Sequence, residues 1–152
     1  MIKVGVIGAG HLGKIHLNIL NSSQFELVGF HDTDIQNSQK LSIEKSYVFY
    51  EQLDDLINNI DAAVIVSPTT SHFDIAKKCI LKGKHVFIEK PLTSNSSEAR
   101  IIKSLADQND IIGDFMELTP HYKKKNKAMV LPDGSIFAFN KDAPGGDLKS
   151  LG

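Results

Sequence analysis

The six residues GAGHLG at positions 8–13 constrain the fold of this chain more than any other feature. The apolar run 2–8 predicts a short buried strand that ends at the first glycine, and apolar residues then recur at helical spacing to about residue 21. A second apolar run, 25–30, closes at Asp32, nineteen residues after Gly13. A strand, a GxGxxG turn, a helix and an acidic residue after the next strand are together typical of a dinucleotide-binding unit.

Each part of this unit has a separate physical reason. The first glycine permits the tight turn, the second lets the backbone approach a pyrophosphate, and the third lets the helix pack closely on the strand. The free N–H groups at the start of the helix favour negative charge, so they suit phosphates. The carboxylate after the second strand would accept hydrogen bonds from the adenosine ribose hydroxyls. The candidate cofactor residues of the unit are Gly8, Gly10, His11, Leu12, Gly13 and Asp32.

Asp32 also bears on the choice of cofactor. A carboxylate at this position repels a 2′-phosphate, and the next residues, Thr33 and Asp34, supply no arginine to bind one. The one arginine of the chain is Arg100, far along the sequence. We therefore expect NAD rather than NADP, and we interpret Asp34 as a helix N-cap.

Strands and helices alternate regularly through the first three quarters of the chain. This alternation predicts a Rossmann-type α/β fold, in which a doubly wound, mainly parallel sheet carries helices on both faces over residues 1–116. Ser71 is expected to begin a helix that Gly83 ends, and Asn95 with Glu98 is expected to cap another. The predicted elements after Asp32 are helices at 34–45, 51–58, 71–82 and 95–108 and strands at 47–50, 62–66, 85–88 and 111–116.

The pattern stops after about residue 116. Residues 117–152 contain turn and loop signals, and within them only 135–139 is predicted to pair as a strand. This stretch is too short to form a second domain by itself. We interpret it as an irregular tail or as a remnant of a link to a further domain.

Composition excludes several classes of function. The formal net charge is −1, from 17 basic and 18 acidic residues, so no global attraction to nucleic acid or to a membrane is expected. The lysine run 123–125 lacks interleaved aromatic residues and is interpreted as a solvated loop. A single cysteine, Cys79, and the lack of a signal peptide or a long apolar run favour the cytoplasm. The histidines show no metal-ligand spacing, so no metal site is expected.

Further candidate residues follow two later strands. Ser67 and Thr69 come after the strand 62–66, at the edge where a cofactor would lie, and either could bind a ribose or a phosphate. His72 has two open interpretations, an approach to the cofactor or a place in the first helical turn. Glu89 and Lys90 follow the strand 85–88 and are candidate cofactor contacts. Such a lysine could stabilise alkoxide character on a substrate oxygen, and Glu89 beside it could orient the lysine or cap backbone groups. Residue type alone favours a surface lysine.

Three segments together resemble the glucose–fructose oxidoreductase/inositol dehydrogenase/MocA family, and most of all its bacterial sugar-nucleotide dehydrogenases. They are the GAGHLG turn, VSPTTSH at 66–72 and GKHVFIEKP at 83–91. The resemblance implies NAD(P)-dependent oxidation or reduction of a sugar, sugar-nucleotide or cyclitol carbon, with a second α/β domain supplying most substrate contacts. It implies that Lys90 is catalytic and assists the reacting hydroxyl, and that Pro91 follows a cis peptide bond.

The chain departs from the family pattern at its C-terminal end. The family follows the last Rossmann strand with an arginine-containing segment, which GDFMEL at 113–118 replaces without the arginine. The glycine-rich stretch 145–152 has no histidine after it. We therefore expect the second, catalytic domain to be absent and an exposed apolar surface to promote self-association.

Two functional hypotheses of different class follow. In the first, the chain is the cofactor-binding part of a sugar oxidoreductase and is inactive alone; in the second, it is a self-standing NAD(H)-binding or sensing module that acts through a partner. An interaction protein that has kept the fold and lost the cofactor is a remote third. The sequence leaves open whether the chain by itself is an enzyme.

Overall fold

The computed structural model describes residues 1–109, 113–115, 127–130, 136–139 and 150–151. Within this part of the chain, five strands form one sheet in the order β2-β1-β3-β4-β5, and all four neighbouring pairs are parallel. The strands are β1 (Lys3–Ile7), β2 (Glu26–His31), β3 (Ala62–Ile65), β4 (His85–Ile88) and β5 (Gly113–Phe115). The helices are α1 (His11–Asn21), α2 (Ile35–Lys45), α3 (Leu53–Asn58), α4 (Thr69–Leu81) and α5 (Ser96–Gln108).

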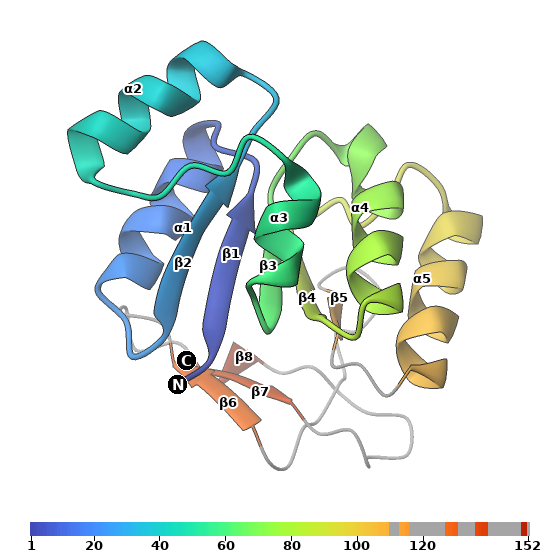
Figure 1. The fold of residues 1–152 in the computed structure, drawn as a ribbon. Coiled ribbons are helices and arrows are strands. Elements are labelled where there is room, and N and C mark those ends of the chain that lie inside the picture. The colour runs from blue at the N-terminus through green and yellow to red at the C-terminus, as the bar shows by residue number, and fades with distance from the viewer. Residues whose placement is uncertain (110–112, 116–126, 131–135, 140–149, 152) are drawn as a thin grey trace.

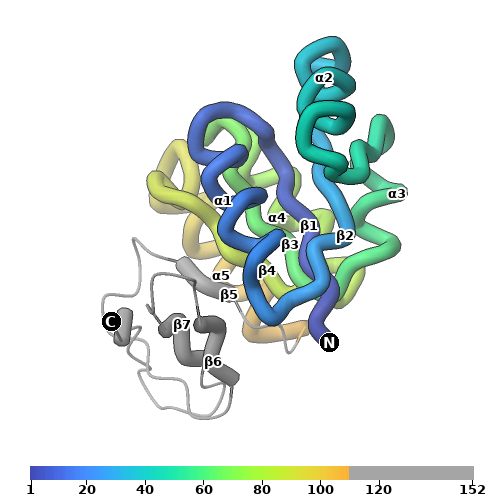
Figure 2. The backbone as a smooth tube through the Cα atoms, turned by 90° about the vertical axis from the view of Figure 1, so that its left-hand side faces the viewer, coloured from blue at the N-terminus to red at the C-terminus, as the bar shows by residue number. Residues whose placement is uncertain are grey.

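The helices cover both faces of the sheet, as predicted (Figure 1). Side chains alternate along β1, so Val4 and Val6 face one core and Ile7 faces the other. One core joins the sheet to α1 and α2, and Figure 2 shows the backbone from the side of α1. The other core joins the sheet to α3, α4 and α5. Each leucine or isoleucine that is fully buried in these cores contributes about 1.5–3 kcal/mol of burial free energy.

The predicted helix ends are mostly confirmed by their caps. The Asp34 carboxylate accepts a hydrogen bond from the Asn37 N–H at 3.1 Å, and the Asn95 side chain accepts one from the Glu98 N–H at 2.9 Å. Gly83 takes a positive φ of 74° just after α4. The start of α4 was predicted two residues too late, because Pro68 is the residue before the first helical turn and Ser71 lies inside that turn.

The predicted strand 47–50 is wrong. The structure has a single parallel bridge there, between Phe30 and Phe49. The Phe30 N–H donates to the Val48 carbonyl and the Tyr50 N–H donates to the Phe30 carbonyl, and the bridge extends no further. Residues 47–50 lie next to β2, the edge strand of the sheet, and pair with it only through Phe30. The β-branched and aromatic residues of this segment therefore do not form a ladder of strand pairing.

Three short strands lie within the C-terminal region. They are β6 (Lys127–Val130), β7 (Ile136–Phe139) and β8 (Ser150–Leu151), which pair antiparallel in the order β6-β7-β8. The prediction of one strand here was incomplete. The residues of β6 follow a lysine run in the sequence and show no clear strand pattern of their own, and the hydrogen bonds of β6 come from its pairing with β7. The predicted turns at 117–126, 131–135 and 140–149 lie outside the described residues.

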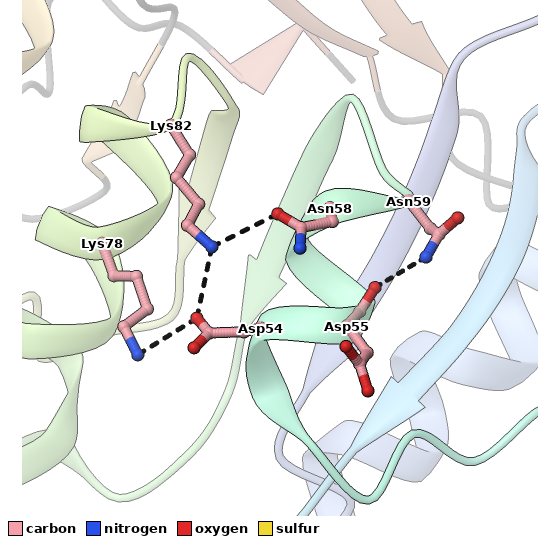
Figure 3. Close-up of polar contacts among 6 residues, drawn as sticks. All are labelled: Asp54, Asp55, Asn58, Asn59, Lys78 and Lys82. Atoms are coloured by element: carbon pink, nitrogen blue, oxygen red, sulfur yellow. Dashed lines mark hydrogen bonds and ion pairs between the residues drawn. The ribbon is translucent and has the colours of Figure 1, made fainter.

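An ion-pair group joins α3 to α4 on the surface (Figure 3). The Asp54 carboxylate accepts hydrogen bonds from the ammonium groups of Lys78 at 3.2 Å and Lys82 at 3.3 Å, and Lys82 also donates to the Asn58 side-chain oxygen. These lysines hold the pKa of Asp54 below its ordinary value. The Asp54 side chain is 56% exposed, so solvent and salt screen the group.

We expect Asp54→Asn to lower the free energy of unfolding only slightly at pH 7, and less at high salt. Because the pKa of Asp54 is lower in the folded state, its stabilisation is present above about pH 4 and is lost as the pH falls through the folded value. Urea unfolding of both proteins at pH 7 and at pH 3, with and without salt, measures this. A difference that grows toward pH 3 would contradict it.

Candidate functional site

The strand order reverses at β1, which pairs with β2 on one side and with β3 on the other. In an open parallel sheet, such a point leaves a crevice at the carboxyl ends of the two diverging strands, and ligands bind there. The turn after β1 and the loop after β3 meet at this point, because a Cβ built on Gly8 would lie 2.5 Å from the Ser67 nitrogen. The Gly8 N–H also donates to the His31 carbonyl of β2 at 2.8 Å.

The three glycines of the turn have different surroundings. Gly8 has a φ of +104°, which disfavours any residue with a side chain. A Cβ on Gly13 would lie 2.0 Å from the Gly8 carbonyl oxygen, so α1 packs against the turn with no room for a methyl group. A Cβ on Gly10 would meet nothing within 4 Å. The backbone at Gly10 therefore borders an open cradle at the N-terminus of α1, which suits a phosphate.

His11 and Leu12 form the first turn of α1 beside this cradle. Both side chains are exposed, and Leu12 is half accessible to solvent. Gly10 precedes the helix in an extended conformation without a capping side chain. The helix thus starts where the sequence predicts it to start, without a side-chain cap on the N–H groups of its first turn.

Asp32 organises the turn itself, which the sequence did not predict. One carboxylate oxygen accepts a hydrogen bond from the Ala9 N–H at 2.7 Å, and the other accepts one from the Asp34 N–H at 2.8 Å. The carboxylate thereby fixes the middle of the glycine turn to the end of β2. A carboxylate has about four acceptor sites, so lone pairs are left for further donors.

The residues after β3 differ in their exposure to solvent and in their contacts. The Ser67 hydroxyl accepts a hydrogen bond from the Ser71 hydroxyl at 2.7 Å, and Thr69 is the first residue of α4; both are half-buried at the crevice. The His72 imidazole is only 2% exposed. Its Nε2 lies 2.7 Å from the Ser67 carbonyl, and its Nδ1 lies 3.0 Å from the Pro91 carbonyl and 3.1 Å from that of Leu92.

These contacts favour the second of the two interpretations of His72. The ring lies in the first turns of α4, and its two nitrogens lie within hydrogen-bond distance of backbone carbonyls of two loops, to which a ring N–H donates. It therefore fastens the loop after β3 to the segment after β4. No sequence signal distinguishes such a histidine from a cofactor ligand.

Glu89 and Lys90 leave the end of β4 in different ways. The Glu89 N–H donates to the Ile65 carbonyl at 3.0 Å, and its carboxylate lies 2.9 Å from the His16 Nε2 on α1. Lys90 is exposed, and the Lys90–Pro91 peptide bond is cis, as the family resemblance implies. The sequence suggested that Glu89 orients Lys90 or caps backbone groups, and it did not predict the partner His16.

The comparisons with known proteins agree with this geometry. A family model described as an oxidoreductase family with an NAD-binding Rossmann fold, that of the glucose–fructose oxidoreductase/inositol dehydrogenase/MocA proteins, matches residues 2–113. This chain belongs to that family. The resemblance found in the sequence and the predicted fold class are both confirmed.

Several characterised family members are similar to the chain. UDP-N-acetylglucosamine 3-dehydrogenase of Acidithiobacillus ferrooxidans is 31% identical, over 73% of this chain and 35% of its own length. Its solved structure superposes with a TM-score of 0.70, at 31% identity, over 73% of this chain and 36% of that one. Glucose-6-phosphate 3-dehydrogenase of Bacillus subtilis is 33% identical, over 83% of this chain and 43% of its own length. The chain thus spans less than half the length of these family members.

Two further observations concern the described residues alone. None of the helices there is both long enough and apolar enough to cross a membrane. Nor do three or more histidine, cysteine, aspartate or glutamate side chains come together in that part of the chain in a way that could hold a metal ion.

Proposed function

We propose that this chain binds NAD and forms the cofactor half of an oxidoreductase that acts on a sugar-type CH–OH group. The observation that carries the proposal is the open cradle at Gly10, bordered by the N-terminus of α1 and by Asp32. A pyrophosphate would lie against the Gly10 backbone, and the ribose hydroxyls would donate to Asp32. We assign cofactor contacts to Gly8, Gly10, His11, Leu12, Gly13, Asp32, Ser67 and Thr69, and a loop-holding part to His72. The Rossmann domain in this proposal ends near residue 116.

The preference for NAD over NADP rests on two carboxylates at the end of β2. Asp32 is held by two backbone N–H groups, so it cannot turn away from a 2′-phosphate without losing them. Asp34 is close behind it, and hydrogen bonds from the backbone and the side chain of Asn37 hold the pKa of Asp34 below its ordinary value. Asp34 therefore stays negative at neutral pH, and the two neighbouring carboxylates repel a dianionic phosphate.

The proposed reaction follows from Lys90 and from the family. The two dehydrogenases named above act, by their names, on position 3 of a sugar derivative. The exposed Lys90 ammonium lies at the carboxyl edge of the sheet, where it would hydrogen-bond the reacting oxygen and stabilise alkoxide character. NAD, when bound, supplies the hydride acceptor. Glu89 binds His16, so the base that removes the hydroxyl proton would come from a second domain.

Titration with NADH and with NADPH tests this proposal. We expect NADH to bind at least about tenfold more tightly, because the 2′-phosphate meets the two carboxylates. Asp32→Asn is expected to weaken NADH binding and to reduce the ratio of the NADPH to the NADH dissociation constant, since an amide offers one acceptor oxygen and no charge. Asp107→Asn, at an exposed carboxylate on α5, is the matched control and should change neither. If neither nucleotide binds below millimolar concentration, the proposed function is wrong; tighter NADPH binding would overturn the cofactor preference.

A further inference from the structure

The contact between His16 and Glu89 joins two parts of the site that are 73 residues apart in sequence. His16 lies one turn after Gly13 on α1, the helix whose N-terminus borders the phosphate cradle. Glu89 is the residue directly before Lys90. The pair is therefore a side-chain link between the proposed phosphate helix and the segment that carries the lysine.

The surroundings of the pair make the contact costly to lose. The His16 side chain is 15% exposed and that of Glu89 is 17% exposed. The imidazole also packs edge-on against the Phe87 ring, at 5.7 Å between centroids. Removing the imidazole nitrogen would leave a largely buried carboxylate without this donor, which costs more than the loss of a surface ion pair.

The backbone around Lys90 is held on three sides. The Glu89 N–H is bonded to β3, the Pro91 and Leu92 carbonyls face His72 on α4, and the Glu89 carboxylate faces His16 on α1. Two of these contacts connect the segment to the β3 side of the crevice. The third connects it to the helix where the cofactor phosphates would bind, so a shift of α1 on binding would be transmitted to Glu89.

We propose that His16 and Glu89 are a positioning pair that sets the place of Lys90 relative to the bound dinucleotide. Neither residue touches the reacting atoms, and both act through the backbone of Lys90. The inference rests on the proposed function, because it couples cofactor binding to the lysine. A merely structural bridge would change stability and leave the response of Lys90 to the cofactor unaltered.

The reactivity of Lys90 toward a small amine-acylating reagent measures this coupling. The rate of modification of Lys90 is followed by peptide mass spectrometry with and without saturating NADH, with the exposed Lys77 of α4 as the internal reference. In the unaltered chain we expect NADH to slow acylation of Lys90 relative to Lys77 by about fivefold or more, the lower end of typical coupling between sites.

Two variants break the pair and one preserves it. His16→Phe keeps a ring against Phe87 without a donor, and Glu89→Leu removes the acceptor. In both variants, saturating NADH should therefore lose most of its protection of Lys90 against acylation. His16→Gln keeps a donor and should retain most of it. Asp54→Asn, in the ion-pair group between α3 and α4, is the control carboxylate and should behave like the unaltered chain. Circular dichroism verifies that each variant is folded.

The outcomes separate this inference from the proposed function. Equal protection in the unaltered chain and in the folded breaking variants would overturn the positioning pair alone. A similar loss in Asp54→Asn would show that the effect is general and would also overturn it. An unaltered chain that binds no NADH would overturn the proposed function, and this inference with it.

Discussion

Alanine at position 13 is expected to destabilise the protein by about 2 kcal/mol, whereas alanine at position 10 should leave stability within about 1 kcal/mol. At Gly13 the added Cβ would lie 2.0 Å from the Gly8 carbonyl oxygen, a backbone atom that cannot swing aside. Overpacking of this kind costs about 3 kcal/mol, and the higher helix propensity of alanine returns about 1 kcal/mol of it. At Gly10 the Cβ meets nothing within 4 Å, and the backbone, with φ of −71°, suits alanine.

The same two substitutions should separate folding from cofactor binding. The Gly10→Ala methyl group occupies the cradle in which a pyrophosphate would approach the backbone. We expect it to weaken NADH binding roughly tenfold to a hundredfold, which corresponds to about 1.4–3 kcal/mol. Urea unfolding and NADH titration of both variants measure the two effects on one pair of proteins.

Gly83→Ala serves as the control, because Gly83 lies just after α4 with a positive φ and open space around it. It should lose some stability through backbone strain and keep its NADH affinity, since it is remote from the turn. Unchanged NADH binding by Gly10→Ala would show that the cradle is not the phosphate site. Full stability of Gly13→Ala would show that α1 and the turn can move apart.

The thiol of Cys79 is expected to be almost inert in the folded protein. Cys79 is fully buried in the core beneath α3, α4 and α5, and this burial raises its pKa from 9.0 to about 12, against the smaller opposing effect of the nearby lysines. The thiolate is the reactive form, so at pH 7.5 its population is lower than that of an unshifted thiol by roughly a thousandfold. Reaction with a thiol reagent should then require opening of the core.

Labelling rates in buffer and in urea measure this protection. The control is Lys77→Cys combined with Cys79→Ala, which places one thiol on the exposed face of the same helix and should react rapidly. The raised pKa also sets a sign for stability: above about pH 9 the unfolded chain loses the thiol proton more readily, so stability falls as the pH rises. Rapid labelling of the folded protein at neutral pH would contradict the packing of α4 described here.

Local patterns in the sequence predicted the cofactor unit and most of the parallel sheet. The GAGHLG turn, the apolar runs and the capping residues Asp34 and Asn95 act over a few neighbouring residues, so spacing alone reveals them. The three-residue intervals between Gly10, Gly13 and His16 also place His16 one turn along α1. The spacing does not reveal the partner of His16, because Glu89 comes close to His16 only when β4 pairs with β3 in the folded sheet.

Most of the contacts that the sequence missed are long-range. His72 faces carbonyls some twenty residues away, Asp32 accepts from a turn twenty-three residues earlier, and β6 and β8 acquire their strand character by pairing with β7. The strand prediction at 47–50 was wrong for the opposite reason. These residues have high β propensity, but they form only a single bridge with the edge strand β2. Propensity describes what a segment can form, and its partners decide what it does form.

The two hydrogen bonds that Asp32 accepts have a kinetic consequence. One holds the Ala9 N–H of the glycine turn and the other holds the Asp34 N–H just before α2, so these two segments are already ordered when a ligand arrives. The conformational entropy of the turn is lost during folding and does not oppose association. Encounter and docking then set the association rate, and differences in affinity among nucleotides lie mainly in their dissociation rates.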